Sequence, residues 1–327
     1  MAIQLPHART PEEFRAVGRN DPRVLSAAGA LCRELGLGEA TLFEAGSLPV
    51  FGAGDAHVLK LYPPCLAEEC DRERSVLTAL DGALPLATPR VVASGGADGW
   101  RYLAMTRVPG TPLDVLWPSL PADDRIRLSG ELGHVLRTLH AVDTSGVPEA
   151  RMDWPRFVRE QTERCVGVQR RKSLAGRWLD QIPAFLARAQ LGTVERPVLL
   201  HTEIMRAHVH AARGAAGWSL SGIVDFEPAM IGAAEYELAS VGVFFTCGSG
   251  PALRALLRAY GYAEAELDAP LQRRLLTYTL LHRYSNLRWY LELIPPGEGI
   301  TTLDALAARW WALGEEPEIA SPVEAGA

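Results

Sequence analysis

Lysine is nearly absent from this chain of 327 residues, occurring only at Lys60 and Lys172 among 33 lysine and arginine residues. Where arginine is so strongly preferred, a retained lysine is a candidate for chemistry that needs a compact ammonium group. Lys172 follows Arg170 and Arg171, and such a basic run is typical of a solvated helix end. Lys60 lies instead in the apolar segment 58–62, where burial of an ammonium group requires an anionic partner.

The chain also lacks the sequence patterns of a metal cage, a membrane protein or a secreted precursor. Its five cysteines are scattered and form no CxxC pair, which argues against a zinc cage or a disulfide framework. No apolar run reaches the roughly 18 residues that a membrane helix needs, and the N-terminal sequence shows no secretory signal. We therefore expect a cytoplasmic protein with no membrane partner.

Basic residues are also fewer than acidic residues, at 33 against 39. The net charge is −6 and the isoelectric point is about 5.8, whereas nucleic-acid binders usually present a basic domain. Hydrophobic residues make up 48% of the chain, which is enough for a sizeable core and excludes a mainly disordered state. These features favour a globular protein with no nucleic-acid partner.

The spacing of apolar residues changes along the chain, from a strand-rich part to a helical part. Residues 40–62 predict a β-hairpin, residues 65–80 a helix, and residues 89–108 two further strands. After the breaker Pro109-Gly110-Thr111-Pro112, apolar residues recur at three- and four-residue spacing and predict helices. The expected helices include 154–171 and 174–190, and a strand–loop–strand unit spans 197–225.

This pattern predicts an α+β fold with two lobes. A small antiparallel-sheet N-lobe spans residues 1–108, a larger and mostly helical C-lobe spans 109–314, and residues 315–327 form a disordered tail. A hinge near 106–112 joins the lobes, and the cleft between them is the expected ligand site.

Lys60 has two candidate partners on the helix that follows its strand. Glu73 lies in the middle of the expected helix, and Glu69 lies one turn earlier. A phosphate-binding lysine oriented by a glutamate explains the pattern, and so does a strand-edge lysine that reaches to water.

The glycine-containing hairpin 46–54, with Ser47 near its start, can bring backbone N–H groups to a phosphate or can be an ordinary hairpin.

A polar loop and a strand end supply the remaining candidates. Glu203 and His208 lie in the loop 201–208 after a short apolar strand, and Asp225 and Glu227 end the next apolar strand. Acids at the ends of adjacent strands can share one metal ion or one reacting group. Taken singly, each acid can also be the cap of a turn.

Two other enzyme classes fit the sequence less well. His201-x-Glu203 matches the first half of a zinc deaminase signature, but the P-C-x-x-C half does not follow it. The G-x-S-x-G elbow of the α/β-hydrolases is also absent.

In their order along the chain, these elements resemble the aminoglycoside phosphotransferases, a family of the protein-kinase-like superfamily that includes the hygromycin B kinases. The resemblance extends over about residues 40–300 and implies a bilobal protein-kinase-like fold. It also implies ATP-dependent transfer of a phosphoryl group to a hydroxyl group. It rests on Lys60, the run 132–140, the loop 201–208, Ile223-Val224-Asp225-Phe226 and Gly232-x4-Glu237-Leu238-Ala239.

Carried over position by position, the resemblance implies a nucleotide site. Lys60 would hold the α- and β-phosphates of ATP with Glu73 as its partner, and Asp225 would bind Mg²⁺. Backbone groups at Thr106 and Val108 in the hinge would receive the adenine. GTP stays open as an alternative donor.

The implied catalytic loop departs from the family pattern. The family has H-x-D-x4-N, whereas this chain has His201-x-Glu203-x4-His208. Glu203 would replace the catalytic aspartate, and a shift of about 1 Å can cost roughly a hundredfold in rate. His208 would replace a metal-binding asparagine, and because imidazole suits transition metals, Mn²⁺ is an alternative to Mg²⁺. A protein that binds a nucleotide or small molecule without turnover is the alternative function.

The resemblance also places an acceptor site in the C-terminal part. Residues 225–314 carry ten acidic residues against seven arginines, which favours a cationic acceptor such as a hygromycin-like aminoglycoside and a role in antibiotic resistance. We expect a monomer or dimer acting on such a small molecule. Three acids are candidates for binding ammonium groups, or are ordinary solvated acids: Glu227, Glu235 and Glu292. Three aromatic residues can stack on a sugar ring or pack in the core: Tyr284, Trp289 and Tyr290.

Overall fold

The computed structural model describes residues 3–312, and these residues fold into two compact units. The first unit contains the chain up to Pro109 together with two later segments, Ser145–Ala150 and Gly222–Ala229. The second unit contains Gly110–Thr144, Arg151–Ser221 and the chain from Met230 onward. The assignment of Gly222–Ala229 brings Asp225 and Glu227 into the same unit as Lys60.

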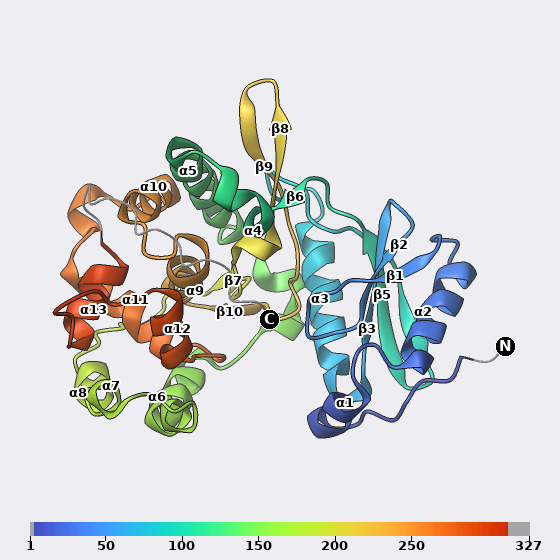
Figure 1. Cartoon of the computed structure of the whole chain (residues 1–327), viewed down its shortest axis with the longest axis horizontal. Coiled ribbons are helices and arrows are strands. Elements are labelled where there is room, and N and C mark those ends of the chain that lie inside the picture. Colours follow the sequence, from blue (N-terminus) through green and yellow to red (C-terminus); the bar gives the residue numbers. More distant parts are fainter. Residues whose placement is uncertain (1–2, 313–327) are drawn as a thin grey trace. The chain divides into compact units, whose positions relative to one another are not determined.

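One antiparallel sheet forms the framework of the first unit (Figure 1). Its strand order is β1-β2-β3-β5-β4. Asp98 and Gly99, with φ of 47° and 82°, form the two-residue turn between the last two strands, because both positions of such a turn require positive φ. The elements are α1 (Pro11–Val17), α2 (Pro22–Glu34), β1 (Ala40–Leu42), β2 (Val50–Ala53), β3 (His57–Tyr62), α3 (Ala67–Leu80), β4 (Val91–Ala97) and β5 (Trp100–Thr106).

Side-chain alternation along β3 separates the core of this unit from its charged residues. Leu59 and Leu61 pack into the hydrophobic core that α2 covers. Lys60 and Tyr62 point to the other face of the sheet, where they meet Glu73 of α3. Figure 1 accordingly shows α2 and α3 on opposite sides of the sheet. The strand period thus places Lys60 and Glu73 together.

The second unit is mostly helical and contains two small sheets. β7 pairs antiparallel with β10, with Leu199 opposite Ile231, and β8 lies between β6 and β9. Its helices are α4 (Leu113–Leu116), α5 (Ala122–Leu139), α6 (Trp154–Arg171), α7 (Gly176–Leu179), α8 (Ile182–Ala187), α9 (Ala234–Ser240), the π-helix Val241–Phe245, α10 (Gly250–Tyr260), α11 (Ala269–Leu281), α12 (Leu287–Leu293) and α13 (Leu303–Trp310). Its strands are β6 (Thr111–Pro112), β7 (Val198–Leu200), β8 (Val209–Gly214), β9 (Gly217–Ile223) and β10 (Met230–Gly232).

The predicted α+β fold with a small antiparallel sheet and a helical part is confirmed. The prediction of one helix over 174–190 is wrong, because α7 ends at Leu179 and α8 begins anew at Ile182. Pro183 suits the first turn of α8 but could not continue an earlier helix, since it lacks an amide hydrogen. The predicted tail 315–327 lies outside the described residues. From residue 3 to residue 312, no helix has the length and apolar character of a membrane span.

Close packing of α5 against α10 leads to a stability prediction. A Cβ atom on Gly133 would lie 2.2 Å from the backbone oxygen of Leu256, whereas at Gly130 of the same helix the nearest atom is 3.8 Å away. Gly133→Ala should therefore cost about 1–3 kcal/mol of unfolding free energy by overpacking. Gly130→Ala should instead add about 0.5–1 kcal/mol, because alanine favours the helix. Urea unfolding followed by circular dichroism measures both, and equal stabilities would contradict this packing.

Candidate functional site

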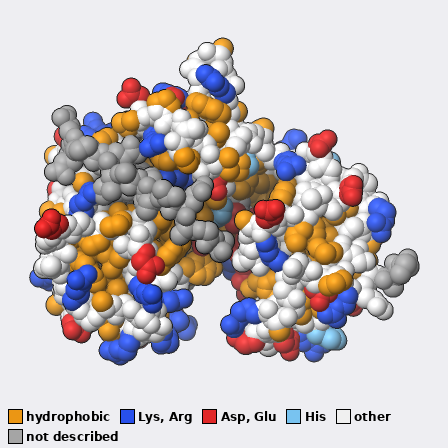
Figure 2. All heavy atoms as spheres, in the orientation of Figure 1, with side chains coloured by type: hydrophobic (Ala, Val, Ile, Leu, Met, Phe, Trp, Pro, Cys, Tyr) orange, Lys and Arg blue, Asp and Glu red, His pale blue; other side chains and the backbone are white. Residues whose placement is uncertain are grey.

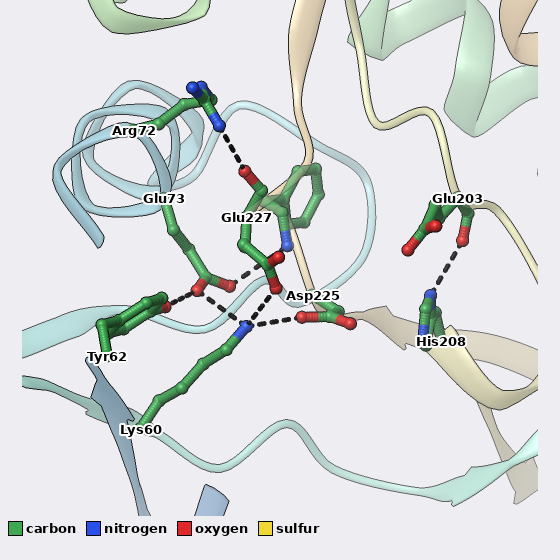
Figure 3. A network of polar contacts seen from close by, with 9 residues as sticks. Lys60, Tyr62, Arg72, Glu73, Glu203, His208, Asp225 and Glu227 are labelled. Carbon is green, nitrogen blue, oxygen red and sulfur yellow. Dashed lines mark hydrogen bonds and ion pairs between the residues drawn. The ribbon is translucent and has the colours of Figure 1, made fainter. Parts of the chain in front are cut away.

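A cluster of charged side chains surrounds Lys60 in the first unit (Figure 3). Its Nζ atom lies 2.6 Å from Oδ1 of Asp225 and 3.1 Å from Oε2 of Glu227. It also lies 3.1 Å from Oε2 of Glu73, and the side chains of Lys60 and Glu73 are only 5% and 1% exposed. One buried ammonium group therefore faces three carboxylates.

The pKa values in this cluster reflect burial and charge. Burial alone disfavours the ammonium form, but the charges of Asp225 and Glu73 outweigh it and raise the pKa of Lys60 well above its usual range. Burial raises the pKa of Glu73, and the charge of Lys60 opposes that rise. Lys60 is therefore a permanent cation, and it favours the ionised form of its buried partner.

Glu73 is held in place by hydrogen bonds from two other segments. The Tyr62 hydroxyl donates to Oε2 of Glu73, the oxygen that also faces Lys60. The backbone N–H of Phe226 donates to Oε1 at 3.2 Å. Burial, and then the charge of Glu73, raise the pKa of Tyr62 well above its usual range, so its hydroxyl keeps its proton. Glu73 thus connects α3, β3 and the segment Gly222–Ala229.

The segment that carries Asp225 and Glu227 is fixed through its backbone. Asp225 has φ of 72°, a left-handed conformation that aspartate tolerates better than most residues. Arg72 of α3 donates to the carbonyl oxygen of Glu227 at 3.3 Å and to that of Glu149 at 3.2 Å. Of the three carboxylates, that of Asp225 is the most exposed, at 32% against 18% for Glu227. Asp225 is therefore the acid of this cluster most open to a ligand.

In the second unit, the loop that follows β7 is anchored by buried side chains. The N–H groups of His201 and Thr202 donate to the two carboxylate oxygens of Glu237 at 2.5 Å and 2.9 Å, and Glu237 is fully buried. Thr202 has φ of 74°, a strained conformation for a β-branched residue. His282 donates from Nε2 to the Thr202 carbonyl at 3.0 Å. Both backbone groups of the strained residue next to Glu203 are thus held.

Hydrogen bonds define the proton positions on two histidines of this unit. Nδ1 of His282 accepts from the N–H of Tyr284 at 3.3 Å, so its proton lies on Nε2, and burial lowers the pKa of His282 to about 4. Nδ1 of His208 donates to the carbonyl oxygen of Glu203 at 2.8 Å. In the neutral His208 ring, Nε2 therefore carries the lone pair, which is the arrangement of a metal-binding histidine.

The two remaining predicted acceptor acids both pair with arginines. Arg274 donates to both carboxylate oxygens of Glu235, at 2.9 Å and 3.0 Å. Arg288 donates to Glu292 at 3.2 Å on the exposed surface of α12. Each acid thus has a cation beside it.

The predicted nucleotide contacts outside the Lys60 cluster all belong to the first unit, where Thr106 is the last residue of β5 and Ser47 and Val108 lie outside the strands. Ser47 is exposed in the bend between β1 and β2. The N–H of Thr106 donates to the carbonyl oxygen of Arg90 at 2.9 Å, and that of Arg107 donates to the carbonyl oxygen of Ala56 at 2.8 Å. Neither of these backbone bonds involves Val108, which is buried.

No group of three or more His, Cys, Asp or Glu side chains within residues 3–312 is arranged to hold a metal ion. A magnesium ion bound through one or two carboxylates and the phosphates of a nucleotide does not need such a group.

Comparison with protein families identifies the class. A model of the APH phosphotransferase enzyme family matches residues 39–274, which is more than half of the chain, and the chain therefore belongs to this family. The resemblance inferred from the sequence is confirmed. No curated protein matches the chain.

Solved structures of antibiotic phosphotransferases share the fold. Aminoglycoside 2'-phosphotransferase-IIIa with GDP is 17% identical, with a TM-score of 0.62, and 78% of this chain covers 90% of that one. The streptomycin–ATP complex of APH(2'')-IIa is 15% identical, with a TM-score of 0.59 and coverage of 87% and 96%. Macrolide 2'-phosphotransferase MphH from Brachybacterium faecium is 22% identical, with a TM-score of 0.59 and coverage of 90% and 100%.

Sequence reasoning missed three residues that position these groups. Tyr62 lies two residues after Lys60, and the strand period could have indicated that both face α3. Arg72 precedes Glu73 but had no recognisable signal, because its acceptors are backbone carbonyls. His282 lies 80 residues from Thr202, and no local pattern connects them.

The buried His282 predicts a pH dependence of stability. Because its pKa of about 4 lies below the usual value of about 6.5, folding favours the neutral ring. The contribution of the neutral His282 ring to the unfolding free energy is fully present above about pH 6.5 and is lost as the pH falls toward 4. Between these pH values the unfolding free energy of the wild type should fall by up to about 3 kcal/mol more than that of His282→Gln, because glutamine retains a hydrogen-bond donor but does not titrate. Urea unfolding over this pH range measures the difference, and parallel profiles would contradict the assignment.

Proposed function

We propose that this chain transfers the γ-phosphoryl group of ATP to a hydroxyl group of a small molecule. The observation that carries the proposal is the buried Lys60 among Glu73, Asp225 and Glu227, in a member of a phosphotransferase family. Proteins of similar fold were solved with GDP, ATP or ADP, which supports a purine nucleotide as donor and keeps GTP as an alternative.

Lys60 is the proposed ligand of the α- and β-phosphates. Its ammonium group faces carboxylate oxygens, and phosphate oxygens could take the place of those from Asp225 and Glu227 while keeping the buried charge paired. Glu73 would hold the lysine side chain in position during this exchange. For the rest of the nucleotide, we propose that Ser47 contacts the phosphates and that backbone groups of Thr106 and Val108 contact the adenine.

Asp225 is the proposed magnesium ligand. Its partly exposed carboxylate is the kind of hard oxygen donor that Mg²⁺ prefers, and three carboxylates around one ammonium group favour a divalent cation. Mg²⁺ bound there would offset the charge of the phosphates. His208 is the proposed second ligand, and its ring nitrogen is the reason to consider Mn²⁺ as well.

Glu203 is the proposed general base, whose carboxylate would accept the proton of the attacking hydroxyl group. The anchoring of His201 and Thr202 by Glu237 supports this role, because a base must be held in a fixed position to act.

The acceptor is proposed to be a glycoside antibiotic. Proteins of similar fold bind streptomycin or kanamycin, or phosphorylate macrolides, so both classes are candidates for this chain. Hygromycin-like aminoglycosides are the first class proposed from the sequence, with Glu227, Glu235 and Glu292 as partners for ammonium groups. The protein would then confer resistance in the cytoplasm, as a monomer or dimer.

A nucleotide-binding protein without turnover is the second candidate function. The observation that favours it is the departure of the catalytic loop from the family pattern H-x-D-x4-N. Glu203 stands in place of the aspartate, and His208 stands in place of the asparagine.

Three substitutions test the phosphotransferase proposal. Lys60→Ala and Asp225→Ala should each lower acceptor-dependent ADP release at least about a hundredfold, because Lys60 would pair with the phosphates and Asp225 would hold the Mg²⁺ that offsets their charge. Glu203→Gln should lower transfer by about 10²- to 10⁴-fold while nucleotide still binds. Lys172→Ala, at the only other lysine, is the matched control and should keep full activity. Full activity of Lys60→Ala would refute its role, whereas nucleotide binding without transfer in the wild type would favour the second candidate.

Metal preference tests the role of His208. In His208→Asn, an amide oxygen replaces a ring nitrogen, so the activity with Mg²⁺ should be kept or raised and the ratio of Mn²⁺ to Mg²⁺ activity should fall. Initial rates at saturating concentrations of each metal give the ratio. An unchanged ratio would show that His208 does not contact the metal.

A further inference from the structure

Three side chains of the second unit form a contact cluster that joins the loop 201–208 to the segments around it, which we call the Arg206 anchor: Arg206, Trp117 and Phe245. The guanidinium carbon of Arg206 lies 4.1 Å from the centre of the Trp117 ring, within the range of a cation–π contact. Its Nε atom donates to the carbonyl oxygen of Phe245 at 2.8 Å. The rings of Trp117 and Phe245 also meet edge to face, with their centres 5.3 Å apart. Arg206 is thus held by both members of one aromatic pair.

The Arg206 anchor lies largely in the interior of the unit. Trp117 is 2% exposed and Phe245 is fully buried. Figure 2 shows lysine and arginine side chains spread over the surface, whereas Arg206 is half-buried. Arg125 of α5 fixes the tryptophan in turn, because its Nε atom donates to the Trp117 carbonyl oxygen at 3.1 Å. A cation–π contact shielded from water is stronger than an exposed one, so the Arg206 anchor is a firm point of attachment.

Arg206 belongs to the downstream half of the loop. It opens the 3₁₀ turn Arg206–His208 and lies three residues after Glu203. The N–H of His208 donates to the carbonyl oxygen of Met205 at 3.0 Å, and Nδ1 of His208 donates to the carbonyl oxygen of Glu203. The turn and the backbone of Glu203 are therefore connected, and Arg206 attaches both to the rest of the unit.

The two halves of the loop are held by different contacts. Glu237 and His282 fix the upstream half through the backbone of Thr202, whereas the Arg206 anchor fixes the downstream half through a side chain. Arginine suits both contacts of the anchor, because its planar guanidinium stacks by its face on an aromatic ring while its N–H groups donate in the plane. Lysine would keep the charge near Trp117 but would lose the planar geometry.

We infer that Arg206 is a positioning residue of the catalytic loop, which fixes the turn that carries His208 and, through it, the backbone of Glu203. This inference rests on the proposed function, since it assigns a role in the same reaction. Arg206 acts through the loop and has no assigned contact with the nucleotide or the acceptor. Its loss should therefore slow phosphoryl transfer without weakening the binding of either substrate.

Amide hydrogen exchange followed by NMR tests the inference without any substrate. In Arg206→Ala the N–H of His208 should exchange about tenfold faster than in the wild type, because the turn opens more often. The N–H of Thr202, which Glu237 holds, should keep its exchange rate and serves as the internal reference. Arg206→Lys should lie between the two proteins. If Arg206→Ala does not fold, Trp117→Phe takes its place, because a smaller ring weakens the cation–π contact and should also speed the exchange.

Steady-state kinetics supplies the second measurement, with kanamycin, streptomycin or erythromycin as the acceptor. Arg206→Ala should lower kcat about ten- to a hundredfold, because a displacement of about 1 Å is enough for such a loss, and should leave both KM values unchanged. Arg206→Lys should recover part of kcat, since it keeps the charge. Arg159→Ala, which removes an exposed arginine of α6 in the same unit, is the control and should keep full activity.

The outcomes separate this inference from the proposed reaction. Equal exchange of the His208 N–H in Arg206→Ala and the wild type, an unchanged kcat, or a raised KM with an unchanged kcat would each overturn the role of Arg206. A wild type that transfers no phosphoryl group to any of these acceptors would count against the proposed function, and the exchange rates would then decide alone whether Arg206 holds the loop.

Discussion

The burial of one ammonium group controls how the first unit is built. Lys60 lies inside the protein only because Glu73, Asp225 and Glu227 surround it. Glu73 depends on it in turn, since removing one partner of a buried ion pair typically costs about 3–5 kcal/mol. Three parts of the chain meet at this charge: the sheet, α3 and the returning segment Gly222–Ala229. The contacts that fold the unit are thus also those that fix its charged groups.

The second unit fixes its charged loop by a different means. Thr202 keeps an unfavourable backbone conformation because Glu237 and His282, both buried, hold its N–H and its carbonyl. A loop whose backbone is already held by such hydrogen bonds loses little conformational entropy when a ligand binds. A loop fixed in this manner can place a reacting group precisely. The proposed base therefore follows a residue whose strain is offset by full hydrogen bonding.

Much of the fold was predictable, whereas the pairing of side chains was only partly so. Periods of two and of three to four residues separate the sheet from the helices, and the order of the motifs indicated the family that the comparison confirmed. The scarcity of lysine singled out Lys60. Partners from distant segments could not be predicted from the sequence, because tertiary packing leaves no local pattern. Examples are the contact of His282 with Thr202 and the arginines that pair with Glu235 and Glu292.

The most direct test of the account is a crystal structure of the protein with Mg²⁺ and a non-hydrolysable ATP analogue. The account predicts that Nζ of Lys60 lies within hydrogen-bond distance of α- or β-phosphate oxygens, that Glu73 remains its partner, and that Asp225 contacts the metal ion. A nucleotide bound elsewhere, with Lys60 still paired to Asp225 and Glu227, would contradict the account.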